Sequence, residues 1–172
     1  FKAALVGYTN AGKSTLMNSL TGSSLLVENK LFATLDSTVR TLKTAGRPKI
    51  LITDTVGLID KLPHSLVASF KSTLDEIRYT NLIIKVVDIT HQCFDKHIST
   101  TQKVLQELGV SDIPSFWVFN KIDLIEEDEI LANLKSRHPD SIFVSGKNSS
   151  GINLFKEKIK SSIVPISHYH PA

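Results

Sequence analysis

Cysteine is almost absent from the sequence, which has one such residue, Cys93, among 172. A single cysteine excludes an internal disulfide, and with it the small secreted folds that cysteine pairs hold together. Long apolar runs are missing as well, because residues 82–84 (Leu-Ile-Ile) already meet a charge at Lys85, whereas a membrane helix needs about 18 apolar residues. No secretory leader is visible. These absences predict a cytoplasmic protein without a membrane span, in which Cys93 is half-buried and structural.

An excess of charge of one sign is missing too. Lys+Arg number 20 and Asp+Glu 17, a net charge of +3 that permits an RNA partner without arguing for one. Hydrophobic residues make up 41% and charged residues 22% of the chain, ordinary values for a globular protein, so wholesale disorder is excluded. The length suits one domain, which we expect to span residues 1–165 and to be monomeric, with a tail at 166–172.

Strand-like and helix-like segments alternate along the chain. Apolar runs predict strands at residues 1–6, 39–45, 49–54, 82–88, 115–120 and 141–145. Apolar residues spaced by three or four predict five helices, which contain residues 16–20, 66–77, 98–108, 130–134 and 152–163. Several strands are apolar on both faces, as buried parallel strands are. The pattern predicts a doubly wound α/β domain, from which residues 21–38 stand out as a long loop with a functional role.

A glycine-rich loop lies between the first strand and the first helix. Residues 7–14 (Gly-Tyr-Thr-Asn-Ala-Gly-Lys-Ser) fit the phosphate-loop pattern G-x-x-x-x-G-K-S in the strand–loop–helix context that it requires. The backbone N–H groups of such a loop curl around a phosphate, and the helix N-terminus adds positive dipole. Lys13 would then reach the β- and γ-phosphates, and the Ser14 hydroxyl would ligate Mg²⁺. The alternative is a glycine-rich turn with an incidental lysine.

A second motif, Asp-Thr-Val-Gly at residues 54–57, ends the third predicted strand. The Asp54 carboxylate would hold Mg²⁺ beside the phosphate loop. Gly57 would let its N–H approach the γ-phosphate, where no side chain fits. The D-x-x-G pattern alone also describes a plain turn, but its place on the strand next to the phosphate loop favours the metal-binding role.

A third motif, Asn-Lys-Ile-Asp at residues 120–123, ends the fifth predicted strand, where open α/β sheets bind ligands. The Asp123 carboxylate can accept from both N1–H and the 2-amine of guanine, and adenine would leave it unpaired. Lys121 would lie along the purine plane, and Asn120 would brace the phosphate loop. Residues 145–147 (Ser-Gly-Lys) would place a backbone N–H at guanine O6, although a simple loop explains them as well. The three motifs and this loop predict binding of guanine over adenine nucleotides.

In their order and spacing these motifs resemble the Ras-like G domains of translation GTPases. More narrowly, residues 7–16 (GYTNAGKSTL), 31–40 (LFATLDSTVR) and 54–70 (DTVGLIDKLPHSLVASF) resemble the HflX family of ribosome-associated GTPases, and the resemblance covers nearly the whole chain. It implies a three-layer P-loop NTPase fold, GTP hydrolysis with Mg²⁺, and a nucleotide switch on the large ribosomal subunit. The departures are Ser37, where a proline is usual, and Gly146, where an alanine is usual. HflX proteins carry an N-terminal domain that would precede Phe1, so we expect this chain to be the G domain alone.

The resemblance also assigns the irregular segment, residues 21–38, to a first switch that the γ-phosphate orders and hydrolysis releases. Two threonines, Thr34 and Thr38, compete for the Mg²⁺ contact there, and we favour Thr34 because related GTPases use the residue before the leucine of this motif. Residues 58–65 would form the second switch. Leu58 stands where many GTPases have a glutamine that orients the attacking water, so unaided hydrolysis should be slow.

The implied site has a catalytic, a metal-binding and a nucleotide-binding part. Lys13, Thr34 and Gly57 would be catalytic, and Ser14, Thr34 and Asp54 would hold Mg²⁺. The residues expected to contact the nucleotide are Asn10, Ala11, Gly12, Lys13, Ser14, Thr15, Thr34, Gly57, Asn120, Lys121, Asp123, Ser145, Gly146 and Lys147. In potassium-stimulated GTPases an asparagine stands at the position of Asn10 and could hold K⁺ between the β- and γ-phosphates; alternatively, Asn10 bonds within the loop or contacts GTP directly.

Two other functions stay open. A related tRNA-modification or ribosome-assembly GTPase would share the motifs, although residues 62–70 favour HflX. A nucleotide-dependent binding module that barely hydrolyses GTP would suit the aliphatic Leu58. The expected partners are GTP or GDP and, in the intact protein, the rRNA of the large ribosomal subunit.

Overall fold

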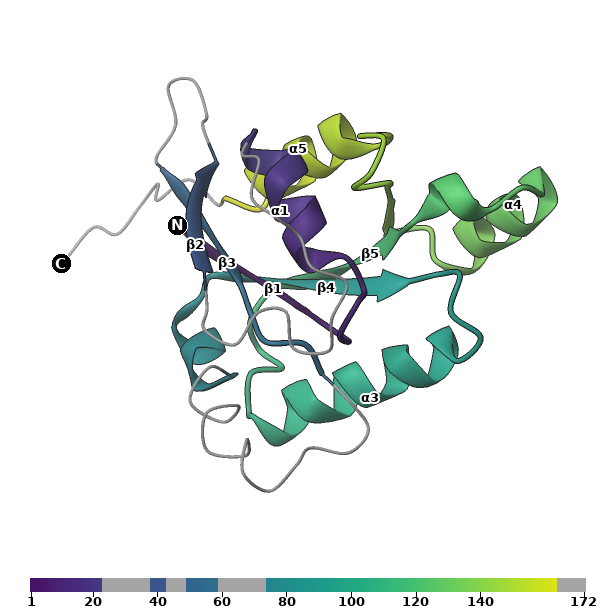
Figure 1. The fold of residues 1–172 in the computed structure, drawn as a ribbon. Helices are drawn as coiled ribbons and strands as arrows, with labels where there is room; N and C mark the ends of the chain where they lie inside the picture. Colours follow the sequence, from purple (N-terminus) through teal and green to yellow (C-terminus); the bar gives the residue numbers. More distant parts are fainter. Residues whose placement is uncertain (23–37, 43–48, 59–73, 164–172) are drawn as a thin grey trace, which may run out of the picture.

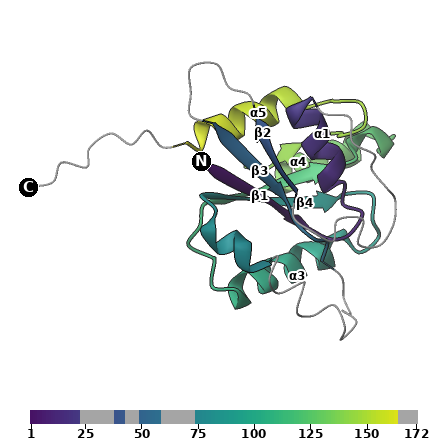
Figure 2. The ribbon, with the colours of Figure 1, turned by 60° about the vertical axis from the view of Figure 1, so that its left-hand side comes forward.

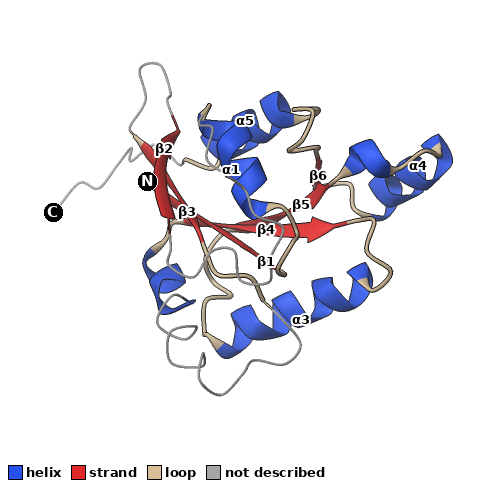
Figure 3. Ribbon diagram, viewed as in Figure 1, coloured by secondary structure: helices blue, strands red, loops and turns tan. Residues whose placement is uncertain are grey.

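The computed structural model describes residues 1–22, 38–42, 49–58 and 74–163 as a layered α/β domain (Figures 1 and 3). Six strands form one sheet in the order β2-β3-β1-β4-β5-β6. The strands are β1 (Lys2–Gly7), β2 (Thr38–Leu42), β3 (Ile50–Asp54), β4 (Leu82–Asp88), β5 (Ser115–Asn120) and β6 (Ile142–Phe143). The helices are α1 (Lys13–Thr21), α3 (Phe94–Glu107), α4 (Asp128–Arg137) and α5 (Ile152–Ser161), with short 3₁₀ helices η2 (Glu76–Tyr79) and η3 (Ile122–Leu124).

All strand pairs are parallel except β2 with β3, which is antiparallel. The first strand of the chain, β1, lies in the middle of the sheet between β3 and β4. Helices flank the sheet on both faces, so its central strands are apolar on both sides, as in β4, where five of the seven residues are buried. The parallel strands therefore all end at the same edge of the sheet, the edge that carries the loops of interest.

Alternation along β1 divides the core into two layers. Ala3 and Leu5 pack with residues of α1 and α5, such as Phe155, in one buried cluster. Ala4 and Val6 point to the other face and pack with Leu105 of α3. Figure 2 shows the corresponding layers, with α1 and α5 together on one side of the sheet and α3 on the other.

The predicted sheet is confirmed, although the bounds of some strands differ from the prediction. The strands predicted at residues 82–88 and 115–120 have those bounds in the structure. The strand predicted at residues 141–145 is shorter, because Ser145 N–H bonds to the carbonyl of Ser150, 2.9 Å away, and so turns into the next loop. Of the five predicted helices, that at 66–77 lies largely outside the described residues, which retain its end as η2.

The expectation for Cys93 was wrong, because this residue is exposed. It is the N-cap of α3 and its backbone is not helical (φ −104°, ψ 28°), so it does not continue the buried stripe of His97, Thr101 and Leu105. Within the described residues, no helix is long and apolar enough to cross a membrane.

Candidate functional site

The predicted motifs meet at one edge of the sheet. The phosphate loop follows β1, Asp54 ends β3 and Asn120 ends β5. Residues 145–147 come after β6, the outermost strand on that side. Because these four strands are parallel, their carboxyl ends bring the motifs together. Thr34 lies outside the described residues, so its predicted place in the site stays a prediction.

The phosphate loop has the backbone that its glycines require. Gly12 is the N-cap of α1 and has φ 90°, in the left-handed region that favours glycine. A Cβ on Gly12 would lie 2.3 Å from the side-chain nitrogen of Asn120. Asn10, at the tip of the loop, also has a positive φ, of 61°, and its side chain is exposed. The loop therefore leads its backbone N–H groups into the N-terminus of the nine-residue helix α1.

Lys13 is buried inside this loop, with 6% of its surface exposed. Its ammonium group donates to the carbonyls of Gly7, at 3.2 Å, and Tyr8, at 3.0 Å. Burial lowers the pKa of Lys13 to about 8, and the nearby Asp54 carboxylate partly opposes this shift. The Lys13 ammonium group is held by carbonyls and shielded from water, so it is well placed to donate to a phosphate oxygen.

Ser14 and Asp54 form the predicted metal-binding pair. The Ser14 hydroxyl donates to one oxygen of the Asp54 carboxylate, which is 2% exposed. Thr38, the second threonine considered for the metal, begins β2 and stands opposite Asp54 in the sheet. Hydroxyl and carboxylate oxygens are the ligands that Mg²⁺ prefers. The Ser14 and Asp54 oxygens therefore fit the ligand preference of Mg²⁺. In the part of the chain that the structure describes, no group of three or more His, Cys, Asp or Glu side chains gathers around a common point.

Gly57 and Leu58 touch the phosphate loop through their backbone. Leu58 N–H donates to the carbonyl of Gly7 at 3.0 Å, and Thr9 N–H donates to the carbonyl of Leu58 at 2.9 Å. A Cβ on Gly57 would lie 2.6 Å from the Cα of Thr9. The glycine is therefore needed for contact between two loops, whatever its role toward the γ-phosphate. The Leu58 side chain is 2% exposed and packs in the core with Val6, so it faces away from solvent.

Asn120 connects the phosphate loop to the loop after β6. Its amide nitrogen donates to the carbonyl of Ala11 at 2.9 Å, and its side-chain oxygen accepts from Gly146 N–H at 3.0 Å. The side chain is 2% exposed. Asn120 thus has the contact with the phosphate loop that the sequence led us to expect.

Lys121 has a partner that the sequence analysis missed. Its ammonium group lies 2.6 Å from the carboxylate of Asp88, the last residue of β4. The other oxygen of Asp88 accepts from the N–H of Thr90 at 2.9 Å, so the carboxylate is fixed from two sides. An acidic residue at the end of a buried strand was the available signal for Asp88.

A pocket of about 370 Å³ joins the base motif to the phosphate loop. It is lined by Gly12, Thr15, Asn120, Lys121, Asp123, Leu124, Gly146 and Lys147. Asp123 is exposed on η3. Ser145, whose contact with the nucleotide stays a prediction, is buried, and its hydroxyl accepts from the N–H of Asn148 at 3.2 Å. The two residues after Ser145 therefore face the pocket while Ser145 itself holds the loop.

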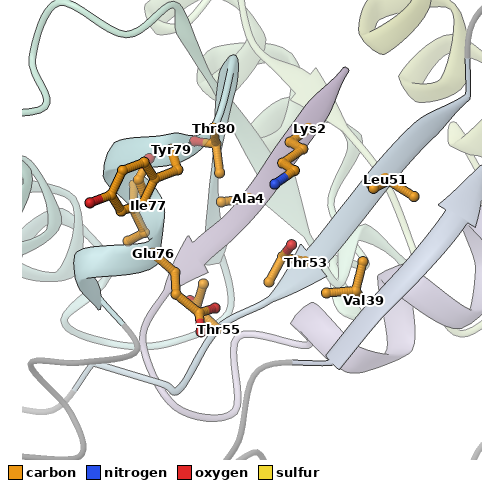
Figure 4. Close-up of a pocket in the computed structure, with 10 residues that line it drawn as sticks. All are labelled: Lys2, Ala4, Val39, Leu51, Thr53, Thr55, Glu76, Ile77, Tyr79 and Thr80. Atoms are coloured by element: carbon orange, nitrogen blue, oxygen red, sulfur yellow. Dashed lines mark hydrogen bonds between the residues drawn. The ribbon is translucent and has the colours of Figure 1, made fainter.

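A second hollow of about 310 Å³ lies between η2 and the strands β1, β2 and β3 (Figure 4). Of the predicted motifs only Thr55 lines it, and the Thr55 hydroxyl already donates to the carbonyl of Leu5 at 2.7 Å. Its charged residues, Lys2 and Glu76, come from different elements, and the Tyr79 ring lies at its rim (Figure 4). The second hollow therefore lacks the convergent donors of the first.

Comparison with known proteins gives a consistent result. A family model described as "50S ribosome-binding GTPase" matches residues 2–121. The GTPase HflX of Gluconacetobacter diazotrophicus is 47% identical over 158 residues, which are 92% of this chain and 35% of the relative. The GTPase HflX of Caldanaerobacter subterraneus is 47% identical over 160 residues, 93% of this chain and 36% of the relative. The chain thus spans about a third of the length of these relatives.

Solved structures agree with the layered fold. A GTP-binding protein from the hyperthermophilic archaeon Sulfolobus solfataricus, in complex with GDP, superposes with a TM-score of 0.74 and is 29% identical. The match covers 96% of this chain and 53% of that protein.

Proposed function

This chain belongs to the 50S ribosome-binding GTPase family and, more narrowly, to the HflX GTPases, and we therefore propose that it binds GTP and slowly hydrolyses it to GDP and phosphate. One observation carries the proposal. The buried Lys13 and the Ser14–Asp54 pair lie at the same edge of the sheet as the pocket of the base motif, and Gly12 also lines that pocket. Each supplies a different part of what a guanine nucleotide needs.

On the phosphate side, the residues act by stabilising charge. Lys13 would donate to oxygens of the β- and γ-phosphates, and the backbone N–H groups of the loop would surround the β-phosphate. Ser14 and Asp54 would hold Mg²⁺, with Thr34 as a further ligand; the bound ion would neutralise charge on the phosphate oxygens. The Gly57 N–H would meet the γ-phosphate.

On the base side, the Asp123 carboxylate would accept from the two donors of the guanine edge. We expect Asp123→Asn to weaken GDP binding and to favour xanthosine diphosphate, whose 2-oxo group suits an amide donor. Calorimetric titration of both nucleotides measures this exchange. Asp112→Asn is the matched control, because Asp112 is exposed and precedes β5, at the opposite edge of the sheet. Equal binding of ATP and GTP by the unmodified chain would contradict the base assignment.

Hydrolysis is proposed to be slow until a partner completes the site. Leu58 is aliphatic and buried, so its side chain supplies no group to orient the attacking water. We propose that the longer protein acts as a nucleotide switch on the large ribosomal subunit in the cytoplasm, contacting rRNA in its GTP state. Single-turnover hydrolysis with and without large subunits tests this, and co-sedimentation of the full-length protein without nucleotide dependence would remove the switch.

Two alternatives predict other outcomes. A binding module would show no hydrolysis above background even with large subunits present. The aliphatic Leu58, which cannot orient an attacking water, favours testing this alternative. A tRNA-modification or ribosome-assembly GTPase would be stimulated by a different RNA or subunit.

We propose further that Asn10 helps to hold a K⁺ ion between the β- and γ-phosphates. The residue is exposed at the loop tip and has a positive φ of 61°. We expect GTP turnover to be faster in KCl than in NaCl at equal concentration, and Asn10→Ala to abolish the difference. Equal rates in the two salts, or a potassium effect that survives the substitution, would refute this role.

A further inference from the structure

Three aromatic side chains stack beneath the phosphate loop. The rings of Tyr8 and His97 lie 3.8 Å apart between centroids, at an interplanar angle of 13°. His91 lies on the same imidazole, 4.3 Å away and tilted by 38°. Tyr8 and His97 are 5% and 8% exposed, so this pair is part of the interior, whereas His91 is exposed at the outer end of the stack. It joins the phosphate loop to α3 and to the turn that precedes this helix.

Tyr8 matters to the loop through its backbone. Its carbonyl accepts both from the Lys13 ammonium group at 3.0 Å and from Ala11 N–H at 3.2 Å. A parallel bridge also pairs Tyr8 with Leu58. The Tyr8 ring packs in the core cluster that contains Val6 and Leu105. Fixing this ring therefore fixes the carbonyl that orients Lys13.

The other side of the stack is held by α3. His97 is buried on the same helix face as Thr101 and Leu105. His91 Nδ1 accepts from the N–H of Cys93 at 3.1 Å, which ties the outer ring to the start of α3. Near-parallel rings at this distance gain energy from their orientation as well as from burial, so an aliphatic side chain would fill the space without fixing the angle.

We propose that His97 is a positioning residue for the β-phosphate, acting through Tyr8 on the Lys13 ammonium group. This inference rests on the proposed binding of guanine nucleotides. It predicts that loss of the stack weakens binding of nucleotides with a β-phosphate and leaves GMP unaffected, because GMP lacks the phosphates that Lys13 would contact.

The test compares GDP and GMP affinities of the 172-residue chain in EDTA, by competition against a fluorescent GDP derivative. We expect His97→Ala to lower GDP affinity roughly threefold to tenfold, the size of one aromatic pair, with GMP affinity unchanged. His97→Phe keeps a flat ring and should restore GDP binding. His97→Asn keeps a polar amide without the ring and should behave like His97→Ala. Leu105→Ala, on the same helix face, should lower the melting temperature and leave the ratio of GDP to GMP affinity unchanged.

Several results would overturn the proposal. Unchanged GDP affinity in His97→Ala removes the positioning role, and an equal loss of GDP and GMP affinity makes the effect merely structural. Rescue by His97→Asn and not by His97→Phe assigns the effect to hydrogen bonding, and a selective loss in Leu105→Ala assigns it to core packing. If the unmodified chain fails to bind GDP, the proposed function itself is wrong. This outcome is distinct from the variant results above, all of which require that the unmodified chain binds GDP.

Discussion

At the scale of single residues, Lys13 combines burial with charge. Removing an ammonium group from water is unfavourable, and here the carbonyls of Gly7 and Tyr8 and the carboxylate of Asp54 compensate only in part, because the pKa of Lys13 still falls to about 8. In the unfolded chain the pKa returns to its ordinary 10.5. Between pH 8 and 10.5 the unfolded state therefore holds more protons than the folded state, so the contribution of Lys13 to stability rises with pH across this window.

A bound diphosphate reverses this shift. We expect GDP to restore the charged form of Lys13, so binding at pH 8.5 should take up a fraction of a proton, while binding at pH 7 should take up almost none. Calorimetry in two buffers of different ionisation enthalpy measures the uptake. Lys85→Met is the control and should keep it, since Lys85 also has a pKa lowered by burial but lies on β4 over the ring of Trp117. Absence of proton uptake at pH 8.5 would contradict the role of Lys13.

Gly57 supports a different residue-scale prediction. A Cβ there would lie 2.6 Å from the backbone of Thr9, so Gly57→Ala must push apart the loops that Leu58 N–H and Thr9 N–H connect. We expect a loss of about 1–3 kcal/mol of unfolding free energy in urea titration. Gly146→Ala is the matched control, because its Cβ would meet Thr15 at 3.1 Å, a contact that small adjustments relieve. Similar losses in the two variants would show that the close approach of Gly57 is unimportant.

At the scale of elements, α5 separates a buried from an exposed side chain at neighbouring positions. Phe155 is fully buried and meets Phe116 edge-on, with centroids 6.1 Å apart, whereas Leu154 is 70% exposed. We expect Phe155→Ala to lower the unfolding free energy by about 3–5 kcal/mol because it leaves a cavity. Leu154→Ala should change it by less than about 0.5 kcal/mol. Denaturant titration of both variants measures these free energies of unfolding. Comparable decreases in the two variants would mean that α5 does not pack as described.

The elements that the sequence predicts best are those whose bounds are set by the local pattern of apolar and polar residues. β4 is apolar on both faces and ends at Asp88, so its bounds could be read directly. The bounds of β6 could not be read in this way, because the strand ends where Ser145 N–H bonds to the carbonyl of Ser150 in the following loop. The exposure of Cys93 was likewise hidden, since periodicity does not reveal where the backbone leaves the helix.

The candidate site likewise divides into residues that local motifs reveal and residues that act through contacts distant in the chain. The motif residues were found because nucleotide chemistry demands particular side chains at short spacing. Asp88 was missed because it meets Lys121, 33 residues away in the chain. The stack of Tyr8 on His97 was missed for the same reason, since ring contacts between distant elements leave no local pattern.

At the scale of the whole molecule, ligand binding and folding are linked. The pocket draws its walls from the phosphate loop, from η3 and from the loop after β6, so it exists only when the domain is folded. GDP at 100 times its Kd should therefore raise the unfolding free energy by about 2.7 kcal/mol. ADP at the same concentration should leave it unchanged, because adenine leaves Asp123 unpaired. Thermal denaturation with each nucleotide measures the difference, and equal stabilisation by both would contradict guanine selectivity.

The central place of β1 has a consequence for how the chain matures as it is synthesised. Among the strands of this sheet β1 is synthesised first, yet its partners β3 and β4 begin at Ile50 and Leu82, so both of its edges wait for later segments. The amide of Asn120, which secures Ala11, follows that residue by 109 positions, roughly 5 to 20 s later at ordinary rates of synthesis. Long-range pairing of this kind slows folding. A nascent chain halted before Asn120 would carry a complete phosphate loop whose Ala11 carbonyl still lacks its side-chain donor.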